Sequence, residues 1–196
     1  MKLLLALLTS LSFVPMAAAQ EISSVYTDLD PDTTCITVDQ AAEGDGDWAT
    51  QTCSGYMGYP VVVSYDDARE SVFYGFPPSG DGNVWESFQG FNAAGNKVEW
   101  RIRKEGEKTV PFATIHRWSV ADPEDSEKKV EVLVVEKVGQ LGERAGCAIG
   151  LVLATGDAQA NETARKIADE QAETFACGDE RTVVGEPMPG FDRQAN

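Results

Sequence analysis

The sequence holds a single histidine, His116, and lacks the short motifs that mark common hydrolase and redox sites. Without a Gly-x-Ser-x-Gly segment, the chain offers no serine nucleophile in the context that a Ser-His-Asp site uses. One histidine cannot form the His-Glu-x-x-His pattern of zinc hydrolases, and the cysteines lack the Cys-x-x-Cys spacing of redox and zinc motifs. We therefore predict no catalytic residue. We expect His116 to pack beside Trp118 or to bond a neighbouring carbonyl group.

Basic residues are also scarce. Sixteen lysines and arginines stand against 32 aspartates and glutamates, for a formal net charge of −16. The imbalance is greatest over residues 21–96, which hold thirteen acids and one base, Arg69. A negative surface repels phosphate backbones and anionic lipids, which argues against nucleic-acid and membrane-surface roles. It suits a basic protein partner, or it serves solubility alone.

Long hydrophobic runs are missing, and the longest apolar stretch lies near the N-terminus. There, Lys2 precedes the apolar segment 3–8, and residues 17–19 form a small-residue cleavage site. This pattern is typical of a secretory signal peptide over residues 1–19, and the stretch is too short for a membrane anchor. We expect a periplasmic or secreted protein without a membrane span.

The four cysteines are predicted to form two structural disulfides, because an even number of cysteines in an oxidising compartment pairs in this way. Cys35 and Cys53 lie at equal distances from a glycine-rich turn, as facing positions of a hairpin would. A strand after Cys147 and a helix that returns before Cys177 would bring the second pair together. We therefore predict the bonds Cys35–Cys53 and Cys147–Cys177.

Short segments rich in β-branched and aromatic residues, separated by turns, predict a chain of strands. The candidates are 35–38, 48–53, 59–65, 71–76, 98–103, 110–120, 129–138 and 147–154. Short links favour an antiparallel meander, either open or curled into a partial barrel. An amphipathic pattern predicts one C-terminal helix over about 158–176, packed on the sheet. The predicted fold is a single α+β domain over 20–177, with a long exposed loop over 77–96 and a flexible tail over 178–196.

Ten of the sixteen aromatic residues beyond residue 19 fall between residues 48 and 91. Tyr56, Tyr59 and Trp85 lie among glycines and turns, where we expect them to be partly exposed. Aromatic rings beside carboxylates such as Asp45 and Asp47 suit glycan stacking or a protein interface. The alternative is that these rings fill the core.

A weak metal-binding pattern precedes the first cysteine. Asp28, Asp30 and Asp32 alternate, and Asp39 falls at the twelfth position, as in part of a calcium loop. Thr33 stands where the sharp turn of such a loop requires glycine, and solvated turn acids explain the pattern equally well. We expect no cofactor, with calcium as the alternative.

Several segments resemble a group of secreted bacterial proteins with two disulfides, to which no activity is attached. These segments are Tyr26-Thr27-x-Leu29-Asp30, Gly55-Tyr56-x-Gly58-Tyr59-Pro60, Pro111-Phe112-Ala113-Thr114-Ile115-x-Arg117-Trp118 and the alanine-rich helix that ends at Cys177. The resemblance implies a bacterial envelope setting and adds no mechanism.

Compartment, charge and composition together predict an exported, disulfide-stabilised binding protein of the bacterial envelope without catalytic activity. Its partner would be a basic protein or an envelope glycan. One concrete version is an inhibitor of a cationic cell-wall hydrolase. The alternatives are an envelope hydrolase that uses acidic residues, whose catalysis depends on the spacing of carboxylates, and a structural envelope component.

Overall fold

The structure, a computed structural model, describes residues 21–79, 85–125 and 127–194, so the predicted signal peptide lies outside the described residues. The described part is mostly β, with one α-helix packed on a sheet. Its elements are β1 (Ile22–Asp28), β2 (Cys35–Gln40), β3 (Trp48–Ser54), η1 (Tyr56–Gly58), β4 (Pro60–Asp66), β5 (Arg69–Tyr74), β6 (Trp85–Phe88), β7 (Asn92–Glu105), β8 (Lys108–Ala121), β9 (Lys129–Lys137), β10 (Cys147–Leu153), α1 (Ala160–Gln171), β11 (Thr182–Val184) and β12 (Phe191–Gln194).

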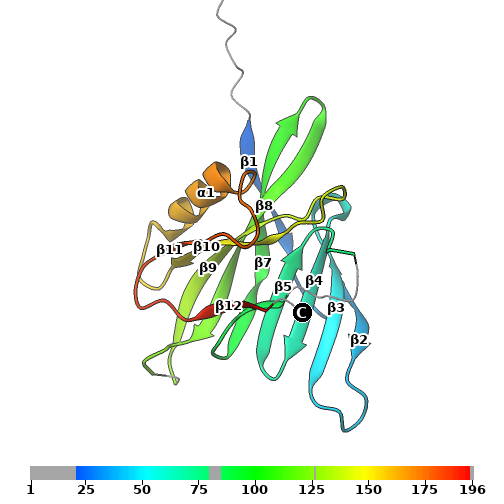
Figure 1. Cartoon of the computed structure of the whole chain (residues 1–196), viewed down its shortest axis with the longest axis vertical. Coiled ribbons are helices and arrows are strands. Elements are labelled where there is room, and N and C mark those ends of the chain that lie inside the picture. The colour runs from blue at the N-terminus through cyan, green and yellow to red at the C-terminus, as the bar shows by residue number, and fades with distance from the viewer. Residues whose placement is uncertain (1–20, 80–84, 126, 195–196) are drawn as a thin grey trace, which may run out of the picture.

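The largest sheet has six strands in the order β1-β7-β8-β9-β10-β11 (Figure 1). Its middle strands, β7 to β10, follow one another along the chain and pair antiparallel, which confirms the predicted meander. Only β11 pairs parallel to its neighbour, β10. Within the described residues the sheet has edges at β1 and β11 and does not close into a barrel.

A second sheet has four strands in the order β2-β3-β4-β5, and strands β6 and β12 pair separately. Cys35 faces Cys53 across β2 and β3, and the two are joined by a disulfide. The second bond joins Cys147, at the start of β10, to Cys177, which follows α1. Both predicted pairings are therefore confirmed.

Two hydrophobic clusters cover the two faces of the six-stranded sheet. Strand alternation explains the division, because successive side chains point to opposite faces. On β8, His116 and Trp118 point towards the four-stranded sheet, where Trp118 joins a cluster with Trp100. Ile115 points to the opposite face, into the cluster under α1.

The helix is shorter than the predicted 158–176, because regular helical hydrogen bonding ends near Gln171 and the chain then turns towards Cys177. Its buried face carries mostly small residues: Ala160, Ala164, Ile167 and Ala168. Gly150 on β10 lies beneath Ile167, and a Cβ at Gly150 would come within 2.7 Å of the Ile167 Cγ2 atom. Small residues on both elements therefore let the helix lie close to the sheet.

Two segments differ from the sequence-based expectation. The predicted loop 77–96 contains β6 and the start of β7, and the predicted flexible tail contains β11 and β12. Packing explains the difference: Phe88 is fully buried, and its ring lies 4.8 Å from that of Phe191. Strands of three or four residues are too short to show a period in the sequence, so burial rather than pattern defines them.

In the described part of the chain, no helix combines the length and the apolar character that crossing a membrane would require.

Candidate functional site

The single histidine is held in the core by two hydrogen bonds. His116 Nε2 lies 2.6 Å from the Gly95 carbonyl oxygen, and Nδ1 lies 2.5 Å from the Tyr74 hydroxyl. These partners assign one neutral tautomer, in which Nε2–H donates to Gly95 and Nδ1 accepts from Tyr74. Burial lowers the pKa of His116 to about 4. The expected packing beside Trp118 is also present, with ring centroids 6.0 Å apart, so His116 has the role of a core residue.

Two buried glutamates lie between the sheets, and no sequence pattern marks them as buried. Glu86 on β6 is 5% exposed and Glu136 on β9 is 2% exposed. Glu86 accepts a hydrogen bond of 2.7 Å from the backbone N–H of Ala148, beside a bulge in β10. Burial raises the pKa of both carboxyl groups, and their mutual repulsion raises that of Glu136 further. Their enclosure leaves a polymeric substrate no access to these carboxyl groups.

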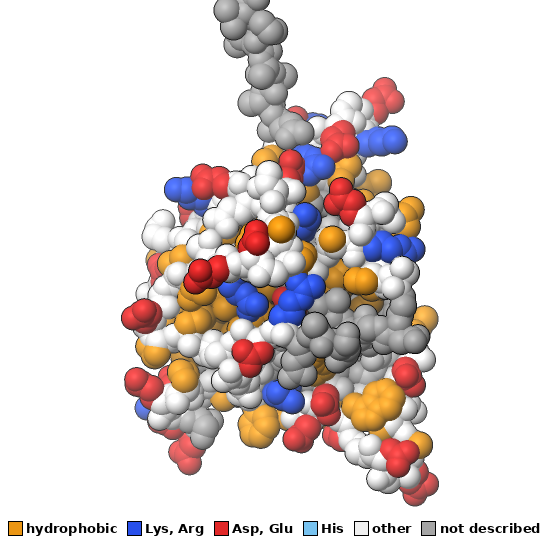
Figure 2. Space-filling model, in the orientation of Figure 1, with side chains coloured by type: hydrophobic (Ala, Val, Ile, Leu, Met, Phe, Trp, Pro, Cys, Tyr) orange, Lys and Arg blue, Asp and Glu red, His pale blue; other side chains and the backbone are white. Residues whose placement is uncertain are grey.

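Acidic side chains gather at one end of the four-stranded sheet. The β2–β3 and β4–β5 turns meet there, because Trp48 faces Asp66 across β3 and β4. Tyr65 donates a hydrogen bond of 3.2 Å to the Asp47 carboxylate across the same end. We call this region the acidic end; its acids are Asp39, Glu43, Asp45, Asp47, Asp66 and Asp67. None of the six forms an ion pair within the described residues, and Figure 2 shows acidic side chains over this part of the surface.

The predicted binding residues divide between two ends of the molecule. Trp85 lies beside the acidic end. The Arg69 guanidinium is 5.9 Å from its ring, and Arg69 stands opposite Asp66 in the pairing of β4 with β5. Tyr56 and Tyr59 belong to the η1 region, at the opposite end of β3. The seven residues of β3 span about 20 Å. Asp45 and Asp47 therefore share a region with Trp85, and the two tyrosines lie elsewhere.

The two tyrosines of the η1 region are partly engaged by the core. Tyr56 packs 6.4 Å from the ring of Trp100. Tyr59 packs 5.3 Å from Phe76, and its hydroxyl donates a hydrogen bond of 2.9 Å to Gln140. Both are half-buried, so they support packing as much as recognition.

Strand β2 forms an edge of the four-stranded sheet beside the acidic end. Two of its apolar side chains face solvent: Ile36 is 69% exposed and Val38 is 55% exposed. A bulge between Thr37 and Asp39 interrupts the pairing with β3. An exposed strand edge with apolar side chains is a surface on which another chain can pair.

The weak calcium pattern resolves into local turn contacts. Asp28 forms an ion pair of 2.6 Å with Lys97. The Asp30 carboxylate accepts hydrogen bonds from the Asp32 backbone N–H and the Thr33 hydroxyl, and the latter lowers its pKa. Among the described residues, no group of three or more histidine, cysteine or acidic side chains is arranged to hold a metal ion.

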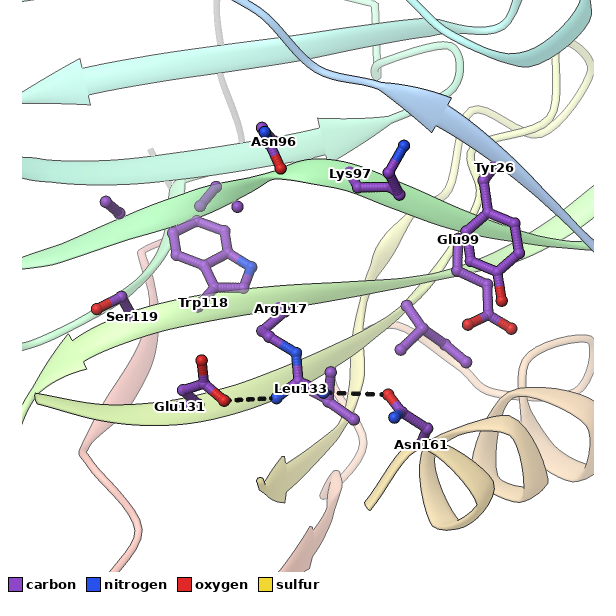
Figure 3. Close-up of a pocket in the computed structure, with 14 residues that line it drawn as sticks. Tyr26, Asn96, Lys97, Glu99, Arg117, Trp118, Ser119, Glu131, Leu133 and Asn161 are labelled. Atoms are coloured by element: carbon purple, nitrogen blue, oxygen red, sulfur yellow. Dashed lines mark hydrogen bonds and ion pairs between the residues drawn. The ribbon is translucent and has the colours of Figure 1, made fainter. Parts of the chain in front are cut away.

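A groove opens on the helix-facing side of the six-stranded sheet, near the start of α1. It has a volume of about 380 Å³ and is lined by residues from β1, β7, β8, β9 and α1 (Figure 3). No single sequence motif predicts this groove, because its lining comes from five elements. A local signal is present in Ala94-Gly95-Asn96, where a glycine interrupts a strand pattern, as happens at bulges.

No protein-family model, curated protein or solved structure matches this chain.

Proposed function

We propose that the protein is a non-catalytic binding protein of the bacterial envelope whose acidic end takes a basic protein partner. The observation that carries this proposal is the convergence of six acids, from two turns and the strand ends beside them, at one end of a sheet. The negative electrostatic potential of these acids attracts a basic surface over distances set by the ionic strength, and it raises the rate of association.

Strand β2 supplies the apolar part of the proposed interface. Ile36 and Val38 are exposed along the open edge of β2, the strand that leads into the acidic end. An extended segment of the partner that pairs with β2 would gain backbone hydrogen bonds, with side-chain contacts on the exposed face. The acidic charge would raise the rate of association, and contacts with the β2 edge would stabilise the complex.

Two further observations support this role over an envelope hydrolase. All four cysteines are bonded in disulfides, as in proteins of oxidising compartments, and none is free to act as a nucleophile. The two buried glutamates, Glu86 and Glu136, are enclosed, whereas glycoside hydrolysis needs carboxyl groups on either side of an accessible bond. Within the class of basic partners, we propose a cationic cell-wall hydrolase, which the protein would inhibit.

The proposal is tested with lysozyme as the basic probe and the disulfide-bonded chain lacking residues 1–19. We expect saturable binding at low salt, weaker binding at high salt, and slower lysozyme turnover when the complex forms. The test variant combines Asp45→Asn, Asp66→Asn and Asp67→Asn. The matched control combines Glu107→Gln, Glu124→Gln and Glu143→Gln, which removes the same charge from exposed positions elsewhere.

Binding should weaken at least tenfold in the test variant and change little in the control, because the position of the charge matters more than its total. Equal weakening in both variants would show that binding depends only on net charge. It would overturn the acidic end as the interface. Failure of lysozyme to bind at low salt would overturn the proposal. Binding without slower turnover would remove the inhibitor version alone.

A further inference from the structure

We propose that the groove near the start of α1 is a binding site for a neutral sugar of one or two pyranose rings. This inference does not rest on the proposed protein partner, because the groove lies on the helix-facing side of the six-stranded sheet and the acidic end belongs to the other sheet.

A bulge in β7 creates the groove. Ala94 pairs with Trp118 and Val98 with His116, so residues 95–97 stand opposite Arg117 alone. The Gly95 carbonyl turns inward to accept the hydrogen bond from His116, which fixes the bulge to the core. Only glycine fits at Gly95, since a Cβ there would lie 2.8 Å from the Arg117 carbonyl oxygen. The widened gap between β7 and β8 is therefore a built feature of the fold.

The charged side chains around the groove are already balanced. Lys97 pairs with Asp28 at 2.6 Å, and Arg117 pairs with Glu131 at 2.8 Å. Glu99 is held by Arg165 at 2.7 Å. A ligand with a net charge would have to displace one of these partners, whereas a neutral ligand leaves them in place. The electrostatics of the groove thus favour an uncharged molecule.

The polar groups on the rim suit a ligand rich in hydroxyl groups. Arg117 is fixed between Glu131 and the Asn161 side-chain oxygen, as the dashed lines in Figure 3 show. These bonds engage two of the five N–H donors of its guanidinium. The Asn161 amide adds two donors, and the Glu131 carboxylate adds acceptors. Hydroxyl groups both donate and accept hydrogen bonds. Adjacent hydroxyls of a sugar can therefore bond to the guanidinium, amide and carboxylate groups of this rim.

The floor and one wall of the groove are apolar or aromatic. Ile115 and Leu133 lie at the base, Trp118 joins the lining where the bulge widens the gap, and the half-exposed ring of Tyr26 stands at the rim. The C–H faces of a pyranose ring pack well against such surfaces while its hydroxyl edge meets the polar rim. The volume falls at the lower end of the range for small-molecule sites, about 300–1,000 Å³.

One buried donor without a partner lies behind the bulge, on the face of β8 that points towards the four-stranded sheet. Trp118 is 1% exposed, and its Nε1–H finds no hydrogen-bond acceptor within the described residues. A buried donor without an acceptor is unfavourable. Because Trp118 also belongs to the lining at the bulge, its indole N–H signal can report changes in the packing of the groove.

The test uses two-dimensional ¹H–¹⁵N NMR, because the indole N–H of each of the four tryptophans gives a separate signal. The probes are cellobiose, maltose and N,N′-diacetylchitobiose, with glucose 6-phosphate and glucuronic acid as charged counterparts. We expect at least one neutral disaccharide to move the Trp118 indole signal and the Asn161 amide signal in a saturable way at millimolar concentration. High salt should leave this binding unchanged, unlike binding of a basic protein.

Asn161→Ala is the test variant, and it should weaken the binding about tenfold. Glu162→Ala is the matched control, since Glu162 is exposed on the same helical turn and does not line the groove. The inference is overturned if no neutral disaccharide moves these signals, or if Asn161→Ala and Glu162→Ala bind alike. Equal or tighter binding of the charged sugars would overturn the neutral ligand class.

Discussion

Burial keeps His116 neutral, and this has a measurable effect on stability. In the folded protein its pKa is lowered to about 4, whereas the unfolded imidazole titrates at about 6.5. Between these values the unfolded state binds more protons, so stability falls as the pH drops from 6.5 to 4. The difference corresponds to about 3 kcal/mol, taken from about 1.4 kcal/mol for each pKa unit.

Urea unfolding at a series of pH values checks this prediction. Between pH 6.5 and 4, the imidazole contributes to the slope of the unfolding free energy against pH. In His116→Gln this contribution should disappear, although the variant will be less stable at every pH. An unchanged slope in this variant would show that His116 does not titrate between the two states.

Glu136 has the opposite effect on the pH dependence. Burial raises its folded pKa well above the usual 4.5, so above pH 4.5 the unfolded state binds fewer protons than the folded state. Stability therefore falls as the pH rises through the folded pKa of Glu136. Glu136→Gln keeps the shape and removes the titration, so we expect a higher unfolding midpoint at neutral pH and a flatter profile on the alkaline side. A lower midpoint at neutral pH would contradict this prediction.

The sequence predicted the role of His116 but not that of Glu136. His116 stands in a clear β pattern beside Trp118, so its burial follows from alternation. Glu136 also follows the alternation of its strand, but nothing local shows that Glu86, fifty positions earlier, enters the same interior. Contacts between charged residues distant in the chain depend on how the sheets stack, which single-strand patterns do not contain.

The bulge in β7 is an element whose geometry depends on one residue. Gly95→Ala should lower stability by about 1–3 kcal/mol, because the new Cβ would meet the Arg117 backbone oxygen at 2.8 Å. Gly142→Ala is the control, since a Cβ there has no neighbour within 4 Å. Chemical denaturation of both variants measures the difference, and equal stabilities would show that β7 adapts without strain.

Helix α1 is fixed to the sheet by charged contacts as well as by its alanine face. Asp169 accepts two hydrogen bonds from Arg101, at 2.8 and 2.6 Å, and the Arg101 side chain is almost buried. Asp169→Asn removes the charge that balances this guanidinium, so we expect a loss of about 2 kcal/mol. Glu170→Gln, at the next and exposed position, should change stability by less than about 0.5 kcal/mol. Thermal unfolding of the two variants distinguishes a specific contact from a general charge effect.

At this scale, the sequence predicted long elements better than short ones. Strands β7 to β10 and helix α1 carry enough residues to show a period, and all of them are present. Strand β1 was not expected, because its side chains are a mixture of serine, threonine and apolar residues without a clear alternation. The candidate sites share this difficulty: the acidic end and the groove each combine residues from several elements.

The two disulfides constrain the whole molecule to different degrees. Cys147 and Cys177 are 30 positions apart and enclose α1. Removing this bond by Cys147→Ser with Cys177→Ser should lower the free energy of unfolding by roughly 3–4 kcal/mol, because the unfolded chain regains loop freedom. The bond Cys35–Cys53 closes a loop of 18 positions and should contribute roughly 3 kcal/mol.

Urea unfolding of the two double variants gives both values, and hydrogen exchange locates the effect. We expect the first variant to lose protection in α1 and β10, and the second in β2 and β3. Loss of protection across the entire molecule in both variants would contradict the assignment of each bond to its own sheet.

The pairing of β6 with β12 affects when this part of the chain can fold during synthesis. Gln89 and Asp192, at the ends of this pair, are 103 positions apart, and the Phe88 ring packs on Phe191. At a synthesis rate of about 5–20 residues per second, Phe88 leaves the ribosome about 5–20 s before its partner. The pair β6–β12 therefore cannot form until the segment around Phe191 has been made. Such a delay suits the export that we propose for this protein, in which the chain would cross a membrane before it folds.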